Sequence, residues 1–111
     1  MGAVRLPTLE TISSPTSGPV PRLYMLWAEG SSVFKIGFTT RSISLRASEI
    51  EASSPLPLRV VASRFGSRED EQAIHARLRT YRTHGEWFSL PEAIVWHVLA
   101  WFGVVVTEGA T

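Results

Sequence analysis

A chain of 111 residues, of which 44% are hydrophobic, is long enough for one folded domain and too short for two full cores. It contains no cysteine, which excludes disulfides, thiolate zinc sites and cysteine nucleophiles. No segment reaches the roughly 18 consecutive apolar residues of a membrane span. Pro, Ser and Thr also interrupt the N-terminus, where a secretion signal needs an apolar core. We therefore expect a soluble, cytoplasmic protein.

The charge is distributed unevenly along the chain. The formal net charge is only +1, which by itself is weak support for a nucleic-acid partner. Between residues 22 and 82, ten Lys and Arg stand against six Asp and Glu, a local balance of +4, and nine of the ten cations are Arg. Arg binds phosphate with two parallel hydrogen bonds. The segment is therefore compatible with DNA binding, although an ordinary solvated surface is the simpler explanation of the charge alone.

The first 21 residues are predicted to form a flexible tail, because Pro, Ser and Thr recur there without a helical or strand period. The domain is expected over residues 22–103, and a second tail over 104–111. Within the domain, two short apolar runs at 23–28 and 33–38 flank a turn and predict an antiparallel hairpin.

A helix is predicted after the hairpin. Its N-terminal caps lie among residues 39–42, and it packs on a stripe repeating at i, i+4 and i+7, which consists of Ile43, Ala47 and Ile50. Pro55 and Pro57 end this helix. The alternating segment 58–65 predicts a third strand.

Two further helices are predicted. Ser67 to Asp70 has the spacing of a capping box and begins a helix that runs to about Tyr81. Residues 83–88 are expected to be a loop. A second box-like start at Ser89 to Glu92 begins a helix over about 90–102, and Gly103 is its expected end.

This last helix is apolar nearly all round, so it either closes the core or forms a homodimer face. The element order ββαβαα predicts an α/β (α+β) fold. We expect a small three-stranded mixed or antiparallel sheet flanked by helices.

Four side chains in this pattern are of the types that phosphodiester hydrolysis requires, namely Tyr24, Lys35, Arg46 and Glu71. The reaction needs a group that activates water, cations that neutralise phosphate charge and a carboxylate that holds a divalent cation. Each residue alone also has an ordinary explanation, such as a strand aromatic, a strand Lys whose stem lies along apolar surface, an exposed helix Arg or a first-turn Glu favoured by the helix dipole.

His75 lies four residues after Glu71 and therefore on the same helix face. The two side chains are suited to form a metal-ligand pair. A zinc hydrolase site requires a third protein ligand, however, and the spacing selects neither His84 nor His97.

The order of the motifs is more informative than the residue types. Six pieces follow one another over residues 22–90: Leu23-Tyr24-Met25; Lys35-Ile36-Gly37; Arg41 with Arg46; Ser54-Pro55; Glu71 with His75; and His84-Gly85-Glu86-Trp87-Phe88. In this order they resemble the GIY-YIG nuclease superfamily. The similarity is greatest to a branch described from phage and fungal open reading frames and regarded as DNA-binding.

The resemblance implies a metal-dependent DNA endonuclease with a GIY-YIG-like fold. Tyr24 corresponds to a general base or water-positioning residue, Arg46 to the Arg that binds the scissile phosphate, and Glu71 to the metal-ligating carboxylate. Lys35 stands where most relatives have a second Tyr. His75, the His of the E-x-x-x-H element, is expected to join the catalytic set.

The resemblance also implies the partners. Arg41, Arg46 and Lys35 are expected to contact DNA. Mg²⁺, or Mn²⁺ in its place, is the expected metal, because it is held by one or two carboxylates together with waters and substrate phosphates.

Two departures from the family pattern bear on the chemistry. Because the second Tyr is missing, the base is either Tyr24 assisted by Lys35 or a partly deprotonated Lys35. The chain also has no Asn, whereas many relatives use an Asn after the metal Glu. Glu86 lies near that slot and is the candidate to replace its hydrogen bonds. Trp87 and Phe88 are expected in the core rather than as platforms for base stacking.

Two other functions stay open at the level of sequence. One is a non-catalytic DNA-binding module of the same fold, and the other is a dimerising interaction or accessory module that uses the helix at 90–102. An accessible Glu71 within reach of Tyr24 and Arg46 favours catalysis, whereas an occluded Glu71 favours binding only.

Overall fold

The computed structural model describes residues 20–104, so the predicted tails lie outside the described residues except at positions 20, 21 and 104. The first half contains strands β1 (Arg22–Ala28) and β2 (Val33–Thr39), helix α1 (Ile43–Glu51) and strand β3 (Leu58–Phe65). The second half contains helix α2 (Arg68–Arg77), the 3-10 helix η1 (Arg79–Tyr81), strands β4 (Arg82–His84) and β5 (Trp87–Ser89), and helix α3 (Glu92–Trp101).

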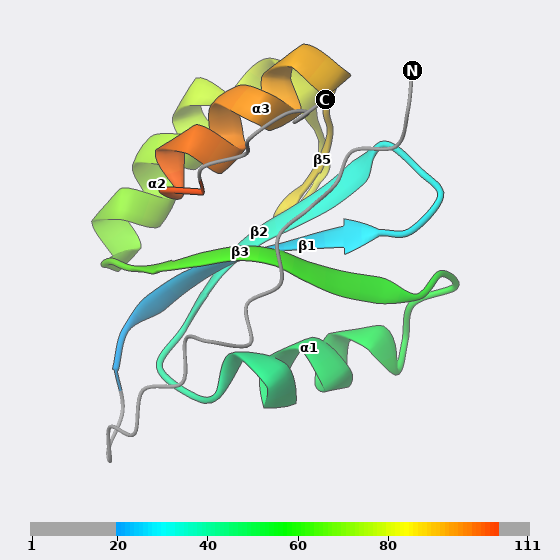
Figure 1. Cartoon of the computed structure of the whole chain (residues 1–111), viewed down its shortest axis with the longest axis vertical. Helices are drawn as coiled ribbons and strands as arrows, with labels where there is room; N and C mark the ends of the chain where they lie inside the picture. The colour runs from blue at the N-terminus through cyan, green and yellow to red at the C-terminus, as the bar shows by residue number, and fades with distance from the viewer. Residues whose placement is uncertain (1–19, 105–111) are drawn as a thin grey trace, which may run out of the picture.

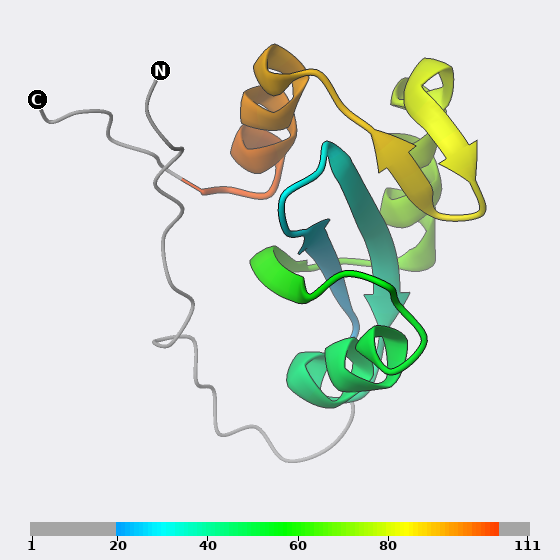
Figure 2. The same cartoon turned by 90° about the vertical axis from the view of Figure 1, so that its right-hand side faces the viewer.

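The strands form one five-stranded sheet in the order β3-β1-β2-β5-β4, and every neighbouring pair is antiparallel. Helix α1 lies on one face of the sheet, and α2 and α3 lie on the other (Figure 1; Figure 2). The prediction of an α+β fold with sheet and flanking helices is confirmed. The prediction of three strands is wrong.

Most of the two missed strands lies in segment 83–88, which the sequence predicts to be a loop. The helix predicted to run to about Tyr81 ends at Arg77, and η1 follows it. β4 and β5 have three residues each, too few for the alternation over roughly four to eight residues that marks a strand in a sequence. They form because β5 pairs with β2, which sets Phe88 directly opposite Phe34. Both aromatic side chains are buried in the core, and the contact between strands far apart in the sequence stabilises the pairing.

The predicted hairpin of β1 and β2 and the predicted strand β3 are confirmed. The caps are confirmed at two helices: Ser42 accepts from Leu45 N at the start of α1, and Ser67 and Asp70 form the capping box of α2. The box expected at the start of α3 is absent, because Ser89 belongs to β5 and Pro91 occupies the cap position without a side-chain bond.

The main core lies between the sheet and the helices α2 and α3. Leu23 and Met25 of β1 contribute to it from the sheet, and α3 contributes Val98 and Leu99. Helix α3 therefore closes the core, which was one of the two alternatives for this apolar segment. None of the helices in residues 20–104 has the length and apolarity that crossing a membrane requires.

The opposite face of the sheet has a close contact between β1 and β2. Tyr24 and Gly37 are directly opposite in the ladder, and a Cβ added at Gly37 would overlap the hydroxyl end of the Tyr24 ring. Tyr24 is only 1% exposed. The glycine of the Lys-Ile-Gly motif is therefore required by the aromatic ring that lies across it.

This contact gives the first prediction. Gly37→Ala should destabilise the domain by about 1–3 kcal/mol, because the added methyl group overpacks the Tyr24 ring. In a Tyr24→Val background the same change should be neutral or stabilising by up to about 1 kcal/mol, since alanine loses less backbone entropy than glycine. Urea unfolding of the four proteins in a double-mutant cycle measures the coupling, and equal costs in both backgrounds would contradict it.

Candidate functional site

The site is built where strand β5 separates from strand β2. The last register pair of the two strands is Lys35 with Trp87, and one further bond joins Ile36 N to Glu86 O at 3.1 Å. The carbonyl oxygen of Ile36 instead receives a hydrogen bond from His75 Nε2 of α2 at 2.8 Å. Because a carbonyl can only accept, His75 donates from Nε2. This bond ties α2 to the edge of β2.

Glu71 lies one turn before His75 on the inward face of α2. It is only 4% exposed, and its Oε2 atom has no hydrogen-bond partner among residues 20–104. Its other neighbours are Arg68, whose Nη1 is 3.6 Å from Oε1, and His75, whose Nε2 is 3.9 Å from Oε2. A buried carboxylate oxygen without a partner costs about 1–3 kcal/mol or more.

Lys35 points from β2 toward the opposite face of the sheet, the face that α1 covers. Its Nζ lies 2.9 Å from Glu86 Oε1 and 5.5 Å from the centre of the Trp87 ring. Lys35 is 9% exposed. A lysine this deeply placed needs a partner for its charge, and Glu86 supplies it.

Tyr24 and Arg46 complete the group. Arg46 is one of four half-buried residues on the inward face of α1, together with Ile43, Ala47 and Ile50. The predicted stripe of α1 is thus only half-buried, and an arginine shares it. Burial raises the pKa of Tyr24, and the adjacent Arg46 guanidinium opposes this rise. The Tyr24 hydroxyl therefore stays neutral near pH 7.

The two carboxylates of the site have opposite shifts. Burial, reinforced by the neighbouring Glu86 carboxylate, raises the pKa of Glu71 to about 7. Burial also acts to raise the pKa of Glu86, but the Lys35 ammonium and a hydrogen bond with Glu71 together outweigh it, so the net pKa of Glu86 is lowered. At neutral pH Glu86 is ionised while Glu71 is poised between its two forms.

The structure thus brings Tyr24, Lys35, Arg46 and Glu71 together. Arg41 is joined to this group through Glu49. It is exposed and forms an ion pair with Glu49, which also contacts Arg46 Nη1 at 3.4 Å. His75 holds α2 against β2 in this structure, so we assign it a positioning role.

The site adds Glu86, which the sequence marked only as a replacement for a missing Asn. For Arg46 and Glu71, the helical pattern of the sequence also indicates a place in the site. Arg46 falls on the apolar stripe of α1, and Glu71 precedes Ile74 by three residues on the stripe of α2. A charged residue on an inward stripe is a mark of function, because burial of its charge is otherwise unfavourable.

The donor set fits a hard divalent cation. In residues 20–104 no three His, Asp or Glu side chains gather as in a zinc site. Mg²⁺ needs only one or two carboxylates, with waters and phosphate oxygens as its other ligands. Glu71 Oε2 is buried and unpartnered, and the Glu86 carboxylate adjoins it. These two residues are the ones that would hold the ion.

The shifted pKa of Glu71 gives a second prediction. The native protein keeps this proton up to about pH 7, whereas an unperturbed glutamic acid, as in the unfolded chain, releases it near 4.5. The native state binds more protons within this window, so its stability should fall as pH rises from 4.5 to 7, by at most about 3 kcal/mol.

Urea unfolding between pH 4.5 and pH 8 measures this slope. The Glu71→Gln variant has no proton to lose at this position, so it should lack the pH dependence that Glu71 contributes. Its free energy of unfolding should therefore fall less than that of wild type between pH 4.5 and pH 8. Glu69→Gln, which changes an exposed residue of the same first turn, is the control and should follow the wild-type profile. Parallel profiles for wild type and Glu71→Gln would refute the assignment.

Comparison with known proteins gives one match. A profile of the T5orf172 domain matches residues 22–103. This domain occurs in phage and fungal open reading frames and is linked to DNA-binding and nuclease-like functions. No curated protein and no solved structure gives a significant match. Because the match covers well over half of the 111 residues, the chain belongs to the T5orf172 domain family.

Proposed function

We propose that this protein is a metal-dependent endonuclease that hydrolyses DNA phosphodiester bonds. The observation that carries the proposal is the buried, unpartnered oxygen of Glu71 beside a second carboxylate. The family membership and the resemblance to GIY-YIG nucleases support it. In the metal-free protein a proton on Glu71 bonds to Glu86 and relieves part of the free-energy cost of burying the two carboxylates, and a divalent cation held by them would take its place.

The remaining residues have separate roles in the proposed reaction. The Arg46 guanidinium binds the scissile phosphate and neutralises its charge. The neutral Tyr24 hydroxyl orients the attacking water, and the Lys35 ammonium, held by Glu86, adds a second positive charge. The ion pair favours Lys35 as a cation over Lys35 as a base. Glu71, with Glu86 beside it, would hold Mg²⁺, which supplies Lewis-acid activation of water and phosphate when bound.

A DNA-binding module without catalysis is the second candidate, and one observation favours it. Tyr24 and Glu71 are 1% and 4% exposed, so both are occluded in this structure. We prefer the nuclease because a binding-only module gains nothing from two adjacent carboxylates near a phosphate site. Like charges there weaken phosphate binding and destabilise the fold.

A chain with one site cuts one strand at a time. We therefore propose that two copies of the protein act together as a homodimer, which is the simplest arrangement for cutting both strands of a duplex.

The nuclease proposal predicts nicking of supercoiled plasmid in the presence of Mg²⁺ or Mn²⁺ and none in EDTA. Glu71→Gln should lower the rate about 100-fold or more, because it removes the charge that holds the cation. Glu69→Gln, the matched control two residues earlier, should cut like wild type. Gel separation of supercoiled, nicked and linear plasmid follows the reaction. Equal nicking by wild type and Glu71→Gln, or no nicking by either with both metals, would reject catalysis.

DNA binding is tested separately from cutting, in EDTA. Arg46→Ala should weaken binding to every sequence alike and reduce the slope of log affinity against log salt by about 1, because one phosphate contact is lost. Arg59→Ala is the matched control, since Arg59 is an exposed arginine already paired with Glu29 at 2.8 Å. Fluorescence anisotropy with a labelled duplex at several salt concentrations gives both slopes. The same salt slope for Arg46→Ala and wild type would rule out Arg46 as the phosphate contact.

A further inference from the structure

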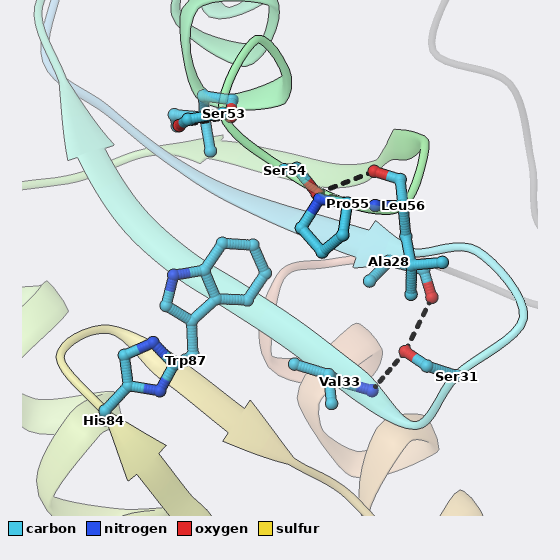
Figure 3. A pocket seen from close by; sticks show the side chains of 10 residues that line it. Ala28, Ser31, Val33, Ser53, Ser54, Pro55, Leu56, His84 and Trp87 are labelled. Atoms are coloured by element: carbon cyan, nitrogen blue, oxygen red, sulfur yellow. Dashed lines mark hydrogen bonds between the residues drawn. The ribbon is translucent and has the colours of Figure 1, made fainter.

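We propose that a pocket beside the candidate site receives an unstacked nucleobase of the bound DNA strand. The pocket has a volume of about 410 Å³ and lies between the end of α1 and the β4–β5 hairpin (Figure 3). Its walls include Trp87, His84, Ile50, Pro55 and Leu56. The inference rests on the proposed function, because it assigns the form of DNA that the site takes.

The pocket adjoins the residues assigned to phosphate binding. Trp87 is directly opposite Lys35 in the β2–β5 ladder, so their side chains emerge side by side on one face of the sheet. Lys35 Nζ lies 5.5 Å from the centre of the Trp87 ring. On the other side, Ile50 follows Arg46 by four residues of α1, a rise of about 6 Å. A strand whose phosphate contacts Arg46 and Lys35 therefore has its neighbouring base at the pocket.

The chemistry of the walls suits a flat aromatic ring. The indole of Trp87 and the imidazole of His84 stand on one side, and Pro55 and Leu56 lie across from them (Figure 3). No carboxylate lines the pocket. Aromatic side chains bind unstacked bases through their faces, at about 1–3 kcal/mol per base. The volume lies within the roughly 300–1,000 Å³ of small-molecule sites.

Most polar groups of the walls are already hydrogen-bonded within the protein, so the pocket offers a nucleobase a largely apolar surface. All three serines of the walls already donate to the backbone: Ser31 Oγ to Ala28 O at 2.8 Å, Ser53 Oγ to Ile50 O at 3.3 Å, and Ser54 Oγ to Leu56 O at 2.7 Å. The described contacts of His84 involve only Nδ1, at 3.2 Å from Thr83 Oγ1. Its Nε2 atom thus adds one hydrogen-bonding group to a mostly apolar slot. This combination favours stacking over readout of one particular base.

A paired base in a duplex is stacked on its neighbours and cannot enter such a slot, so it must first leave the helix. The pocket therefore assigns single-stranded or locally unpaired DNA as the substrate class of the adjacent site. The phosphate contacts hold the strand, and Trp87 holds the base next to the phosphate that is cut.

The test compares binding of two labelled single strands of equal length in EDTA, one with bases and one abasic throughout. Wild type should bind the strand with bases about 5- to 100-fold more tightly, the ratio expected for one stacked base. Trp87→Ala should reduce this ratio to near one while keeping the affinity for the abasic strand. Trp87→Phe should keep most of the ratio, and Phe65→Ala, an aromatic side chain 61% exposed that does not line the pocket, should leave it unchanged.

Circular dichroism establishes that each variant is folded. A ratio near one for wild type, or an unchanged ratio for folded Trp87→Ala, would overturn the proposal and leave the pocket to a protein segment. Plasmid cutting with no base preference removes the pocket assignment and leaves the nuclease standing. A base preference that depends on Trp87, without any cutting, supports the pocket and removes the nuclease. No binding to either strand at any salt concentration removes the pocket assignment and leaves the nuclease to the plasmid test.

Discussion

The β2–β5 ladder ends at the Lys35–Trp87 pair, and the candidate site depends on this end. If β5 continued along β2, a backbone N–H of β5 would bond the carbonyl of Ile36. His75 of α2 could then not bond that carbonyl. Because the ladder ends, His75 bonds this carbonyl and brings Glu71 to the gap. One short strand pairing thus decides whether the carboxylate from one face of the sheet meets the lysine and tyrosine of the other.

The site is assembled at a cost in stability. Helices α1 and α2 each place a charged residue, Arg46 and Glu71, on the face that normally buries apolar side chains. The first lies beside Tyr24, and the second keeps an unpartnered oxygen. Lys35 and Glu86 offset each other's charge, so the unfavourable free energy of burying charge falls mainly on Glu71. Such concentration is typical of functional sites, where the fold elsewhere supplies the missing stability.

The hydrophobic core and most of the candidate site lie on opposite faces of the sheet. The face toward α2 and α3 is apolar and carries the core, with α3 closing it. The face toward α1 carries Tyr24, Lys35 and Trp87, and α1 covers only part of it (Figure 2). The short α1, with none of its residues fully buried, leaves room for both the proposed phosphate site and the adjoining pocket. The alternation of side chains along each strand makes this division possible.

The sequence by itself determined the long elements and selected four candidate site residues. Hydrophobic period and caps are local properties, so the β1–β2 hairpin, β3 and the starts of α1 and α2 were readable. The order of motifs then selected Tyr24, Lys35, Arg46 and Glu71. Only the tertiary structure decided the rest, namely β4 and β5, the partnership of Glu86 with Lys35, the bond from His75 to Ile36 and the setting of Trp87. Lys35 and Glu86 are 51 residues apart, and Ile36 and His75 are 39 residues apart. A three-residue strand has too little local pattern to reveal its partner.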